Sequence, residues 1–425
     1  RAGVNMATLT DVLLVTANVG SLFDNIGDIQ RDWLQELYKT IQSHKPQFIA
    51  LHFQEVGGKD YMVNMSHAEN FFWDIESSAE MKDYDRVCVY VDADFQAEDS
   101  FTALGSMYFI HNTLKNIYQY DFQDEDYKAV SGHSRHVASL NGITTVEKEK
   151  FPKNFWPDFK WSRKGFMRTR WIIHNHLTCC PHLFLDLVNI HLFHDASNLI
   201  ACNSSPSIYS ANRKNALRYV INRISDARHP PAPFFLFGDF NFRLDALSLV
   251  QEQHLSTSAD VQTVKNDNSN EVRIICEERD NDHQVLLHIE EKLFTYLHQA
   301  VFREDNGRAL LKYDKEVSAF YDVIREENIQ FPPSYPYSEE YSQPTQYMNT
   351  RCPAWCDRVL MSQTVQKFIH KKEDDDDGKK VVYNTVGPNV CMGDHKPVFL
   401  FFSFKTNEGK HLAIKDFTHH LCVLA

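Results

Sequence analysis

The segment that most constrains the fold is an apolar run near the middle of the chain that is followed at once by polar residues. Residues 231–245 read PAPFFLFGDFNFRLD. The apolar residues 234–237 predict a buried β-strand that ends at a glycine. Asp239 and Asn241 then follow, two residues apart. Because side chains two apart point to the same face of a strand, we expect both to face one site, with the neighbouring phenylalanines packed behind them.

Short apolar runs alternate with helical segments along most of the chain. Residues 11–19 and 47–56 predict two strands, and between them apolar residues recur at helical spacing over residues 29–41. A further helix is predicted over residues 206–226, and residues 246–330 are expected to be polar and mostly helical. No repeat and no Gly/Ser-rich linker divides the chain. Strands this numerous, mixed with helices, predict an α/β fold with two packed sheets flanked by helices.

Composition limits the classes of partner that the protein can have. The chain has 425 residues and 43% hydrophobic composition, which is enough for a large core. Its net charge of −13 argues against a nucleic-acid partner, because phosphate-backbone affinity needs a basic face. Nine cysteines without the paired spacing of a zinc site indicate reduced thiols in a cytosolic protein. Neither a membrane span nor a signal peptide is expected, and residues 1–10 are expected to be disordered, with a vector-derived start.

Polar residues also follow other predicted strands. A polar side chain at the end of a buried strand costs desolvation free energy unless it has a partner, so several such ends are expected to converge on one pocket. Each residue alone has a common structural explanation, such as a turn-capping Asn or a hydrogen-bonded His. Together they favour a functional site. The residues are Asn18, Glu55, His191, His194, Asp195, Asp239, Asn241, Asp357, Arg358, Asp394 and His395.

Two motifs resemble those of a known family. FGDFNFRLD and RCPAWCDRVL are similar to the paired motifs of the inositol polyphosphate 5-phosphatases, members of the endonuclease/exonuclease/phosphatase superfamily, and GDHKPV follows them. The resemblance extends from about Leu13 to Phe404, so residues 11–405 are expected to form one catalytic domain. It implies a DNase I-like fold, a four-layer α-β-β-α sandwich of two mixed sheets. Within the family, LLVTANVGSLFD and FPPSYPYSE resemble the type I branch, which acts on soluble inositol phosphates.

The resemblance implies a Mg²⁺-dependent phosphatase that terminates calcium signalling. A phosphate monoester is anionic and resists attack by water, so catalysis needs charge neutralisation, an aligned water and a base. Mg²⁺ prefers oxygen ligands, and Glu55 is the expected ligand with Asn18 beside it. Asp239 is the expected base. Asn241 is expected to orient the phosphoryl oxygens, and His395 and His191 to contact the phosphate. Asp357 is expected to orient His395, and Asp394 to support the water or the metal. Arg243 is expected to brace the site through an ion pair.

Positive charge for the remaining substrate phosphates must be local, because the chain is acidic overall. Residues 148–170 carry eight basic side chains against two acidic ones. Lys164 resembles the family's K-G motif, and two arginines after it alternate with apolar neighbours on a predicted strand. The lipid-cleaving branch carries lysines where this chain has Pro336 and Asn349, which favours soluble inositol tris- and tetrakisphosphates over the alternative, phosphoinositide lipids. The predicted substrate contacts are Lys164, Arg168, Arg170, Tyr335, Arg351 and Lys396.

The last residues, LCVLA, match a C-a-a-X prenylation signal at Cys422 with a farnesyl-type final residue. The resemblance supports this interpretation, because type I enzymes end in such a box. One prenyl chain holds a membrane only weakly. We therefore expect a flexible tail over residues 406–425 and a monomeric cytoplasmic protein that associates peripherally with the cytoplasmic face of the plasma membrane.

Two other classes of function were weighed. DNases, abasic-site nucleases and sphingomyelinases of the same superfamily share the Asn, Glu, Asp-x-Asn and Asp-His constellation, but the PAWCDR motif and the net charge of −13 argue against a nuclease. A non-catalytic binding module would be expected to have lost at least one of Glu55, Asp239 or His395, and all three are present.

Overall fold

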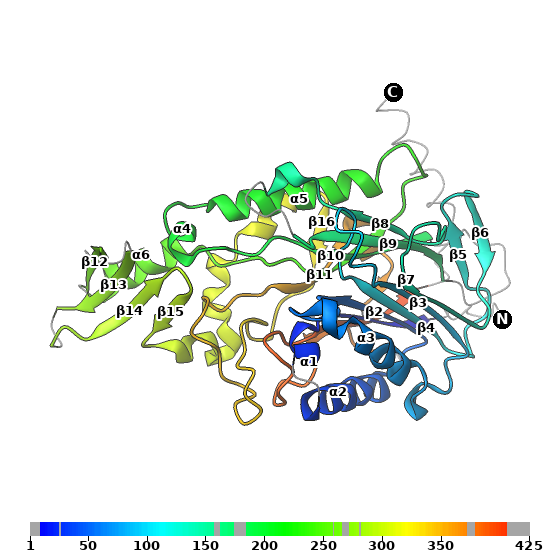
Figure 1. The fold of residues 1–425 in the computed structure, drawn as a ribbon, viewed down its shortest axis with the longest axis horizontal. Helices are drawn as coiled ribbons and strands as arrows, with labels where there is room; N and C mark the ends of the chain where they lie inside the picture. The colour runs from blue at the N-terminus through cyan, green and yellow to red at the C-terminus, as the bar shows by residue number, and fades with distance from the viewer. Residues whose placement is uncertain are drawn as a thin grey trace, which may run out of the picture.

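Two eight-stranded sheets pack face to face at the centre of the protein (Figure 1). In the first sheet, β1 (Leu9–Asn18) pairs in parallel with β2 (Phe48–Gln54) and antiparallel with β20 (Val398–Lys405). The strand order is β18-β20-β1-β2-β4-β3-β7, with β19 paired to β20. The other strands of this sheet are β3 (Arg86–Asp92), β4 (Gly105–Ile110), β7 (His133–Ala138), β18 (Ile369–His370) and β19 (Val382–Thr385).

The second sheet is built around the apolar run of residues 234–237. This run lies in β11 (Phe234–Asp239), which pairs in parallel with β10 (Phe184–His191) and antiparallel with β17 (Asp357–Ser362). The strand order is β16-β17-β11-β10-β9-β5-β6, with β8 paired to β9. The other strands are β5 (Tyr118–Asp121), β6 (Asp126–Ala129), β8 (Glu147–Lys150), β9 (Gly165–Ile172) and β16 (Ile324–Glu326).

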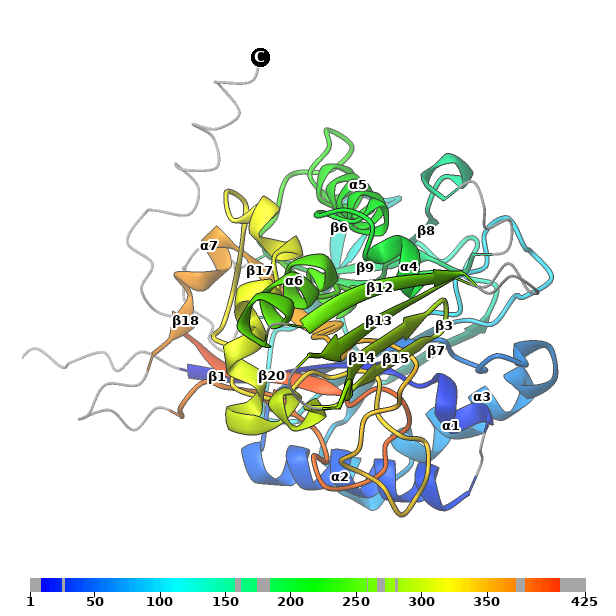
Figure 2. The same ribbon diagram turned by 90° about the vertical axis from the view of Figure 1, so that its left-hand side faces the viewer.

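Helices cover the outer face of each sheet, as Figures 1 and 2 show. α1 (Gly20–Asp24), α2 (Asp28–His44) and α3 (Tyr61–Glu76) cover the first sheet, and α5 (Ile208–Ile224) covers the second. Both long predicted helices therefore form. In α2 the apolar residues recur every four positions and are buried, which is the pattern of a helix packed on a sheet. The predicted fold class, an α-β-β-α arrangement of two mixed sheets, is confirmed.

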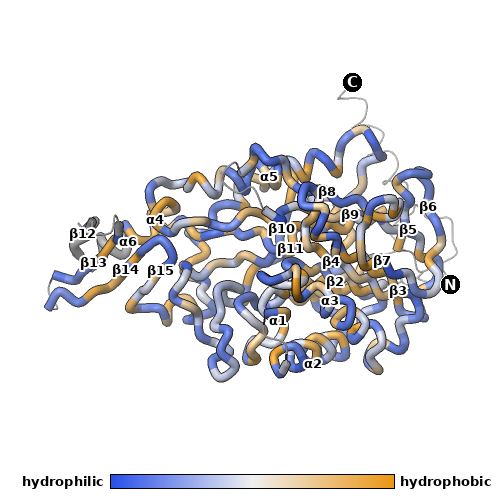
Figure 3. The backbone as a smooth tube through the Cα atoms, viewed as in Figure 1, coloured by the Kyte–Doolittle hydropathy of each residue, from blue (hydrophilic) through white to orange (hydrophobic). Residues whose placement is uncertain are grey.

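The core between the sheets is apolar at its centre and polar near one edge (Figure 3). Leu14 and Phe48 of the first sheet belong to the same buried cluster as Leu187 and Phe237 of the second. Towards the carboxyl ends of the strands, Gln54 donates a 2.8 Å hydrogen bond to Asn189 across the sheets. Buried polar groups need such partners, so this pair ties the two sheets together below the edge where the polar strand ends gather.

Residues 246–330 differ from the mostly helical segment expected from the sequence. After α6 (Ala246–Thr257), the chain forms a separate four-stranded antiparallel sheet. This sheet lies at one end of the long axis of the protein (Figures 1 and 2). The signal for strands lay in the short apolar runs of its two inner strands, VRIICEE and VLLHIE. The elements are β12 (Ala259–Lys265), β13 (Val272–Glu278), β14 (Val285–Glu290), β15 (Leu293–Tyr296) and the 3₁₀ segments Gln299–Phe302, Glu304–Tyr313 and Glu316–Phe320.

The remaining short elements are α4 (Asn198–Ala201), α7 (Gln363–Gln366) and 3₁₀ turns at Ala79–Met81 and Lys153–Phe155. Among the residues placed in the structure, no helix combines the length and apolar character needed to cross a bilayer. Residues 1–8 of the predicted start and residues 406–425 of the predicted tail, with Cys422, lie outside the described residues, whereas Leu9 and Thr10 begin β1 and are not disordered as expected. The computed structural model describes residues 9–24, 27–156, 162–173, 184–257, 259–265, 272–279, 282–371 and 379–405.

Candidate active site

The carboxyl ends of β1, β2, β10 and β11 meet at one edge of the two sheets. Asn18 ends β1, and its amide donates a 3.1 Å hydrogen bond to Oδ2 of Asp239, which ends β11 in the other sheet. His191 ends β10 and lies opposite Asp239 in register. Glu55 follows β2, and its carboxylate lies 3.7 Å from His191 Nε2. Because parallel strands present their carboxyl ends at one edge, four strands contribute side chains to one polar cluster.

Asp239 and Asn241 lie together, but not because they share a strand face. β11 ends at Asp239, and Asn241 has a left-handed backbone with φ of 52°. The backbone N–H of Asn241 donates a 2.9 Å hydrogen bond to Asp239 Oδ1, which closes the turn. The expected strand alternation is therefore wrong as the reason for their proximity. An Asx-type turn, in which an Asp side chain accepts from the backbone two residues on, brings them together instead.

The oxygens of Glu55 and Asn18 converge over Gly20. A Cβ added to Gly20 would lie 2.6 Å from Glu55 Oε2 and 3.4 Å from Asn18 Oδ1. The Glu55 carboxylate accepts no hydrogen bond from any residue within the described ranges, and its side chain is 27% exposed. Burial acts to raise the pKa of Glu55, but Lys164, His191 and Arg163 together lower that pKa to about 2. An ionised carboxylate with free lone pairs beside an amide oxygen fits a hard divalent cation.

Replacing Gly20 with Ala should raise the Mg²⁺ concentration needed for half-maximal activity by about tenfold. The new Cβ would displace the flexible end of the Glu55 side chain, 2.6 Å away, and not the backbone. Substitution of a residue that supports a metal ligand, without binding the metal itself, weakens metal affinity about 10–100-fold. Activity measured across a Mg²⁺ titration tests this, with thermal unfolding without metal as the control for folding. An unchanged Mg²⁺ requirement would contradict the assignment of Glu55.

Lys164 lies directly before β9 and reaches His191. Its Nζ lies 2.5 Å from His191 Nε2, and His191 Nε2 in turn lies 3.4 Å from Asp239 Oδ2. Burial lowers the pKa of Lys164 to about 8, although Glu55 and Asp239 act to raise it. Burial and the Lys164 charge also lower the pKa of His191. At neutral pH the imidazole is therefore neutral, and its Nε2 lies between the Lys164 ammonium group and the Asp239 carboxylate.

His395 forms the opposite side of the cluster. Its Nδ1 donates a 2.8 Å hydrogen bond to Asp357 Oδ2, which also accepts from the Ser334 hydroxyl at 2.7 Å. Its Nε2 lies 3.8 Å from Asp239 Oδ2. Burial opposes protonation, but Asp357, Asp239 and Asp394 raise the pKa of His395 to about 10. The ring is therefore an imidazolium at neutral pH, and its Nε2–H can donate to an anion.

Asp239, Asp357 and His395 also form a group that could hold a metal ion, since one ligand atom of each lies within 4.8 Å of the others among the described residues. The Asp357–His395 hydrogen bond already occupies one side of this group. Burial raises the pKa of Asp239, but His395, His191 and Lys164 lower it far more, so the carboxylate is ionised. A protonated imidazole cannot ligate a cation, so the oxygens of Glu55 and Asn18 are the better donors for a hard divalent cation.

Asp394 fixes the first helix to the loop before β20. The Ser21 hydroxyl lies 2.9 Å from Asp394 Oδ1 and 2.7 Å from Glu339 Oε1, and the Asp394 backbone N–H donates to the same hydroxyl at 3.1 Å. Burial, with the nearby Glu55 and Glu339, raises the pKa of Asp394, although His395 lowers it. Asp394 therefore holds the backbone that carries Asn18 and His395. Ser21, Ser334 and Glu339 lie inside the quoted segments LLVTANVGSLFD and FPPSYPYSE, but no role was predicted for them.

Tyr335 and Arg243 close the cluster on the side of the second sheet. The Tyr335 ring lies 4.5 Å from the His395 ring, and the Arg243 guanidinium lies 4.8 Å from the Tyr335 ring centre. Arg243 was expected to form an ion pair. Instead its Nη2 donates a 2.7 Å hydrogen bond to Asn241 Oδ1, and the Asn241 amide donates to Leu192 O at 3.0 Å. Arg243 therefore fixes which way the Asn241 amide points.

Known proteins match this chain over its whole length. Inositol polyphosphate-5-phosphatase A of Canis lupus familiaris is 53% identical over 424 residues, which covers 100% of both chains. A probable type I inositol 1,4,5-trisphosphate 5-phosphatase of Caenorhabditis elegans is 35% identical and covers 93% of this chain and 100% of its own length. The chain belongs to the inositol polyphosphate 5-phosphatase family. Residues 305–401 also match the family model "Endonuclease/Exonuclease/phosphatase family 2".

Among solved structures, the inositol polyphosphate 5-phosphatase domain of SPsynaptojanin, in complex with inositol (1,4)-bisphosphate and calcium ion, is 13% identical. It has a TM-score of 0.46 and covers 98% of this chain and 91% of that chain.

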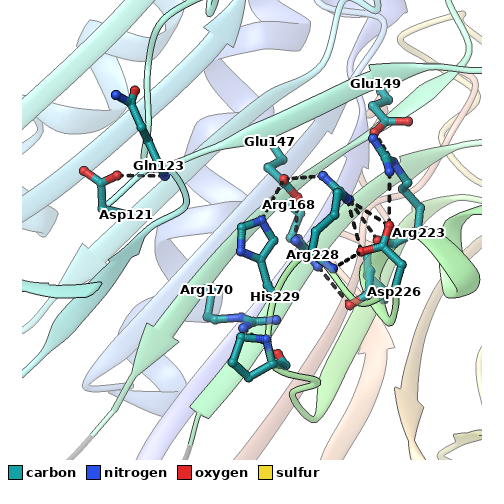
Figure 4. Close-up of polar contacts among 12 residues, drawn as sticks. Asp121, Gln123, Glu147, Glu149, Arg168, Arg170, Arg223, Asp226, Arg228 and His229 are labelled. Atoms are coloured by element: carbon teal, nitrogen blue, oxygen red, sulfur yellow. Dashed lines mark hydrogen bonds and ion pairs between the residues drawn. The ribbon is translucent and has the colours of Figure 1, made fainter. Parts of the chain in front are cut away.

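In this 5-phosphatase, two of the predicted substrate contacts lie elsewhere. Arg170 pairs with Asp186 at 2.5 Å, and Arg168 pairs with Glu147 at 2.5 Å and Asp186 at 3.5 Å. Both guanidiniums are buried in a charged network that Figure 4 shows together with Arg223 and Asp226. The expectation that these arginines face the substrate is wrong. β9 carries them away from Lys164, and Arg170 lies directly opposite Asp186 on β10.

Two further predicted substrate contacts of the 5-phosphatase, Lys396 and Arg351, differ in whether they lie near the polar cluster. Lys396 is also misplaced as a substrate contact, because its Nζ donates to Val390 O and lies 4.8 Å from the Tyr337 ring centre, inside the loop before β20. Arg351 does lie beside the cluster. Its guanidinium donates to Asn198 Oδ1 at 3.0 Å and to Asp195 O at 3.2 Å.

Proposed function

We propose that this protein removes the 5-phosphate from soluble inositol polyphosphates, Ins(1,4,5)P3 and Ins(1,3,4,5)P4, in a Mg²⁺-dependent reaction. The observation that carries the proposal is the convergence of Glu55, Asp239 and His395 at one edge of the two sheets in a member of this family. The full-length similarity to a type I enzyme supports the soluble substrate. Hydrolysis of the trisphosphate would end the calcium signal that it carries.

Each residue of the polar cluster has a separate proposed role in hydrolysis. Glu55, with Asn18, would hold Mg²⁺, which would supply positive charge against the phosphoryl oxygens. His395 donates its Nε2–H to a second phosphoryl oxygen, where charge develops in the transition state. Lys164 adds a further positive charge, 2.5 Å from His191. Asn241 retains one amide hydrogen that is not used by Leu192 and can donate it to the same ester.

Asp239 is the proposed base for the attacking water. Its pKa is held low by the cations around it, so it is ionised at neutral pH and ready to accept a hydrogen bond. A bound phosphate dianion neutralises those same cations and so raises the basicity of Asp239 when it is needed. The water proton passes to an Asp239 oxygen as the new P–O bond forms, and the inositol oxygen leaves on the opposite side of phosphorus.

Soluble substrate should be cleaved faster than lipid. Phosphate release from inositol 1,4,5-trisphosphate should exceed release from micellar phosphatidylinositol 4,5-bisphosphate, because Pro336 and Asn349 replace the lysines of the lipid-cleaving branch. EDTA should abolish both activities. A clear lipid preference would refute the substrate assignment, and nicking of plasmid DNA in Mg²⁺ would instead favour a nuclease.

The C-terminal Cys422 is proposed to carry a prenyl group that gives the protein a membrane-bound fraction. The Cys422→Ser variant, expressed in eukaryotic cells, should move entirely to the cytosolic fraction, with unchanged activity per molecule. The same protein made in bacteria serves as the unprenylated control. Equal membrane fractions for wild type and variant would end this proposal.

A further inference from the structure

A cavity of about 380 Å³ lies beside the active site, between α5, the loop after β11 and residues 313–319. Its floor is largely apolar and includes Leu244, Phe294 and Cys352. Arg243 and Arg351 line the wall nearest the active site. None of the motifs that identify the family assigns a role to this cavity.

The acidic side chains of the cavity all lie in ion pairs. Asp195 accepts from Arg213 at 2.6 Å, and Asp245 accepts from Lys315 at 2.8 Å. Both oxygens of Glu316 accept from Arg213, at 2.8 and 2.9 Å. Because Arg213 serves both Asp195 and Glu316, these three carboxylates face only two ion-paired cations, Arg213 and Lys315.

The remaining cations have no carboxylate partner. Within the described ranges, neither Arg243 nor Arg351 lies within 4.0 Å of a carboxylate oxygen, although Arg243 is only 8% exposed. Arg243 and Arg351 line the same cavity, and burial with the Arg243 charge lowers the pKa of Arg351. Lys214 is exposed at the rim and forms no ion pair among the described residues. Asp195 lies near both arginines, but five cations, with Arg213 counted, face three carboxylates around this cavity. The excess of positive charge favours a bound anion.

The backbone adds to this positive field. The 17-residue helix α5 begins at Ile208, and its first residues line the cavity. Unpaired backbone N–H groups and the helix dipole favour anions at such an end. The Ser207 side chain accepts only the Ser210 N–H at 3.2 Å, which leaves other donors of the first turn available.

We infer that this cavity binds a phosphate monoester, with Arg243, Arg351 and Lys214 as its cations. Guanidinium groups match phosphate oxygens in pairs, and the apolar floor suits the carbon ring that carries the ester. The phosphate has two possible sources, a distant phosphate of the substrate bound at Asp239 or a second, separate anion. The first source rests on the proposed function. In either case the ligand touches the active site, because Arg243 also holds Asn241 Oδ1 at 2.7 Å.

The Lys214→Glu variant tests the inference without changing the residues around Asp239. Lys82→Glu is the matched control, because Lys82 is an exposed lysine in the loop before β3, at the opposite end of the strands from the active site. Calorimetric titration with inositol 1,4-bisphosphate should give a dissociation constant about five- to tenfold weaker in Lys214→Glu for the affected site, from loss of one charge-assisted contact. Lys82→Glu should match wild type.

Stoichiometry and kinetics separate the two sources. One molecule bound per chain, with a raised KM for inositol 1,4,5-trisphosphate and an unchanged kcat, identifies the substrate's own phosphate. Two molecules per chain, with only the second weakened in Lys214→Glu, identify a separate anion. Equal binding and equal KM in wild type and Lys214→Glu overturn the inference while leaving the phosphatase activity intact. Absence of hydrolysis by wild type refutes the proposed function, and the titration still tests the cavity.

Discussion

The Asp239→Asn variant should lose at least about 10³-fold in kcat while it remains folded. The amide cannot take the proton of the attacking water, and general-base catalysis of this kind contributes about 10²–10⁴-fold. Asp239 also accepts the 3.1 Å hydrogen bond that joins the two sheets at Asn18, and an Asn can replace this acceptor. Steady-state phosphate release from inositol 1,4,5-trisphosphate at saturating Mg²⁺ measures the loss.

The stability of Asp239→Asn should change little, for an electrostatic reason. Asp239 lies close to Asp357, whose pKa is raised to about 6 by burial and by the Asp239 charge, although His395 opposes this. Removing one negative charge relieves that repulsion and offsets the lost attraction to His395. Thermal unfolding should stay within a few degrees of wild type, and the exposed Asp85→Asn substitution is the control for loss of an Asp alone. Retained activity in Asp239→Asn would remove the base assignment.

Local patterns in the sequence placed the strand ends correctly where an apolar run stops at a polar residue. The runs before Asn18 and Asp239 have strand length and are buried, so the first polar residue falls at the sheet edge. Parallel pairing of β1 with β2 and of β10 with β11 then gathers these ends. This part of the site follows from chain connectivity and burial alone.

The cations could not be placed in the same way, because their partners lie on other strands. Arg170 and Lys164 belong to one basic segment, but only Lys164 reaches the cluster. The register of β9 on β10 sets Arg170 opposite Asp186, and a cross-strand pair of this kind is invisible to a single-strand pattern. The role of Ser334 was missed for a related reason. Its hydroxyl donates to the Asp357 carboxylate at 2.7 Å and accepts from the Asp357 backbone N–H at 3.1 Å, and neither contact leaves a spacing signal in the sequence.

Replacing His395 with Ala should lower kcat by about 10²–10³-fold, because a preorganised cationic donor to the phosphoryl oxygens is lost. It should also lower the free energy of unfolding by about 3–5 kcal/mol, the usual cost of removing one partner of a buried ion pair.

The Asp357→Asn variant separates the role of His395 in catalysis from its role in stability. It keeps His395 but removes the neighbour that most raises its pKa to about 10. A raised pKa means that protonated His395 stabilises the fold below its unfolded pKa near 6.5, and this contribution is lost as pH rises through about 10. In Asp357→Asn, the fall in activity and in unfolding free energy that accompanies deprotonation of His395 should therefore occur at lower pH than in wild type. His111→Gln, far from the site, is the control and should leave the wild-type pH profile unchanged. A pH profile that is the same in wild type and Asp357→Asn would show that the imidazolium is not the group that meets the phosphate.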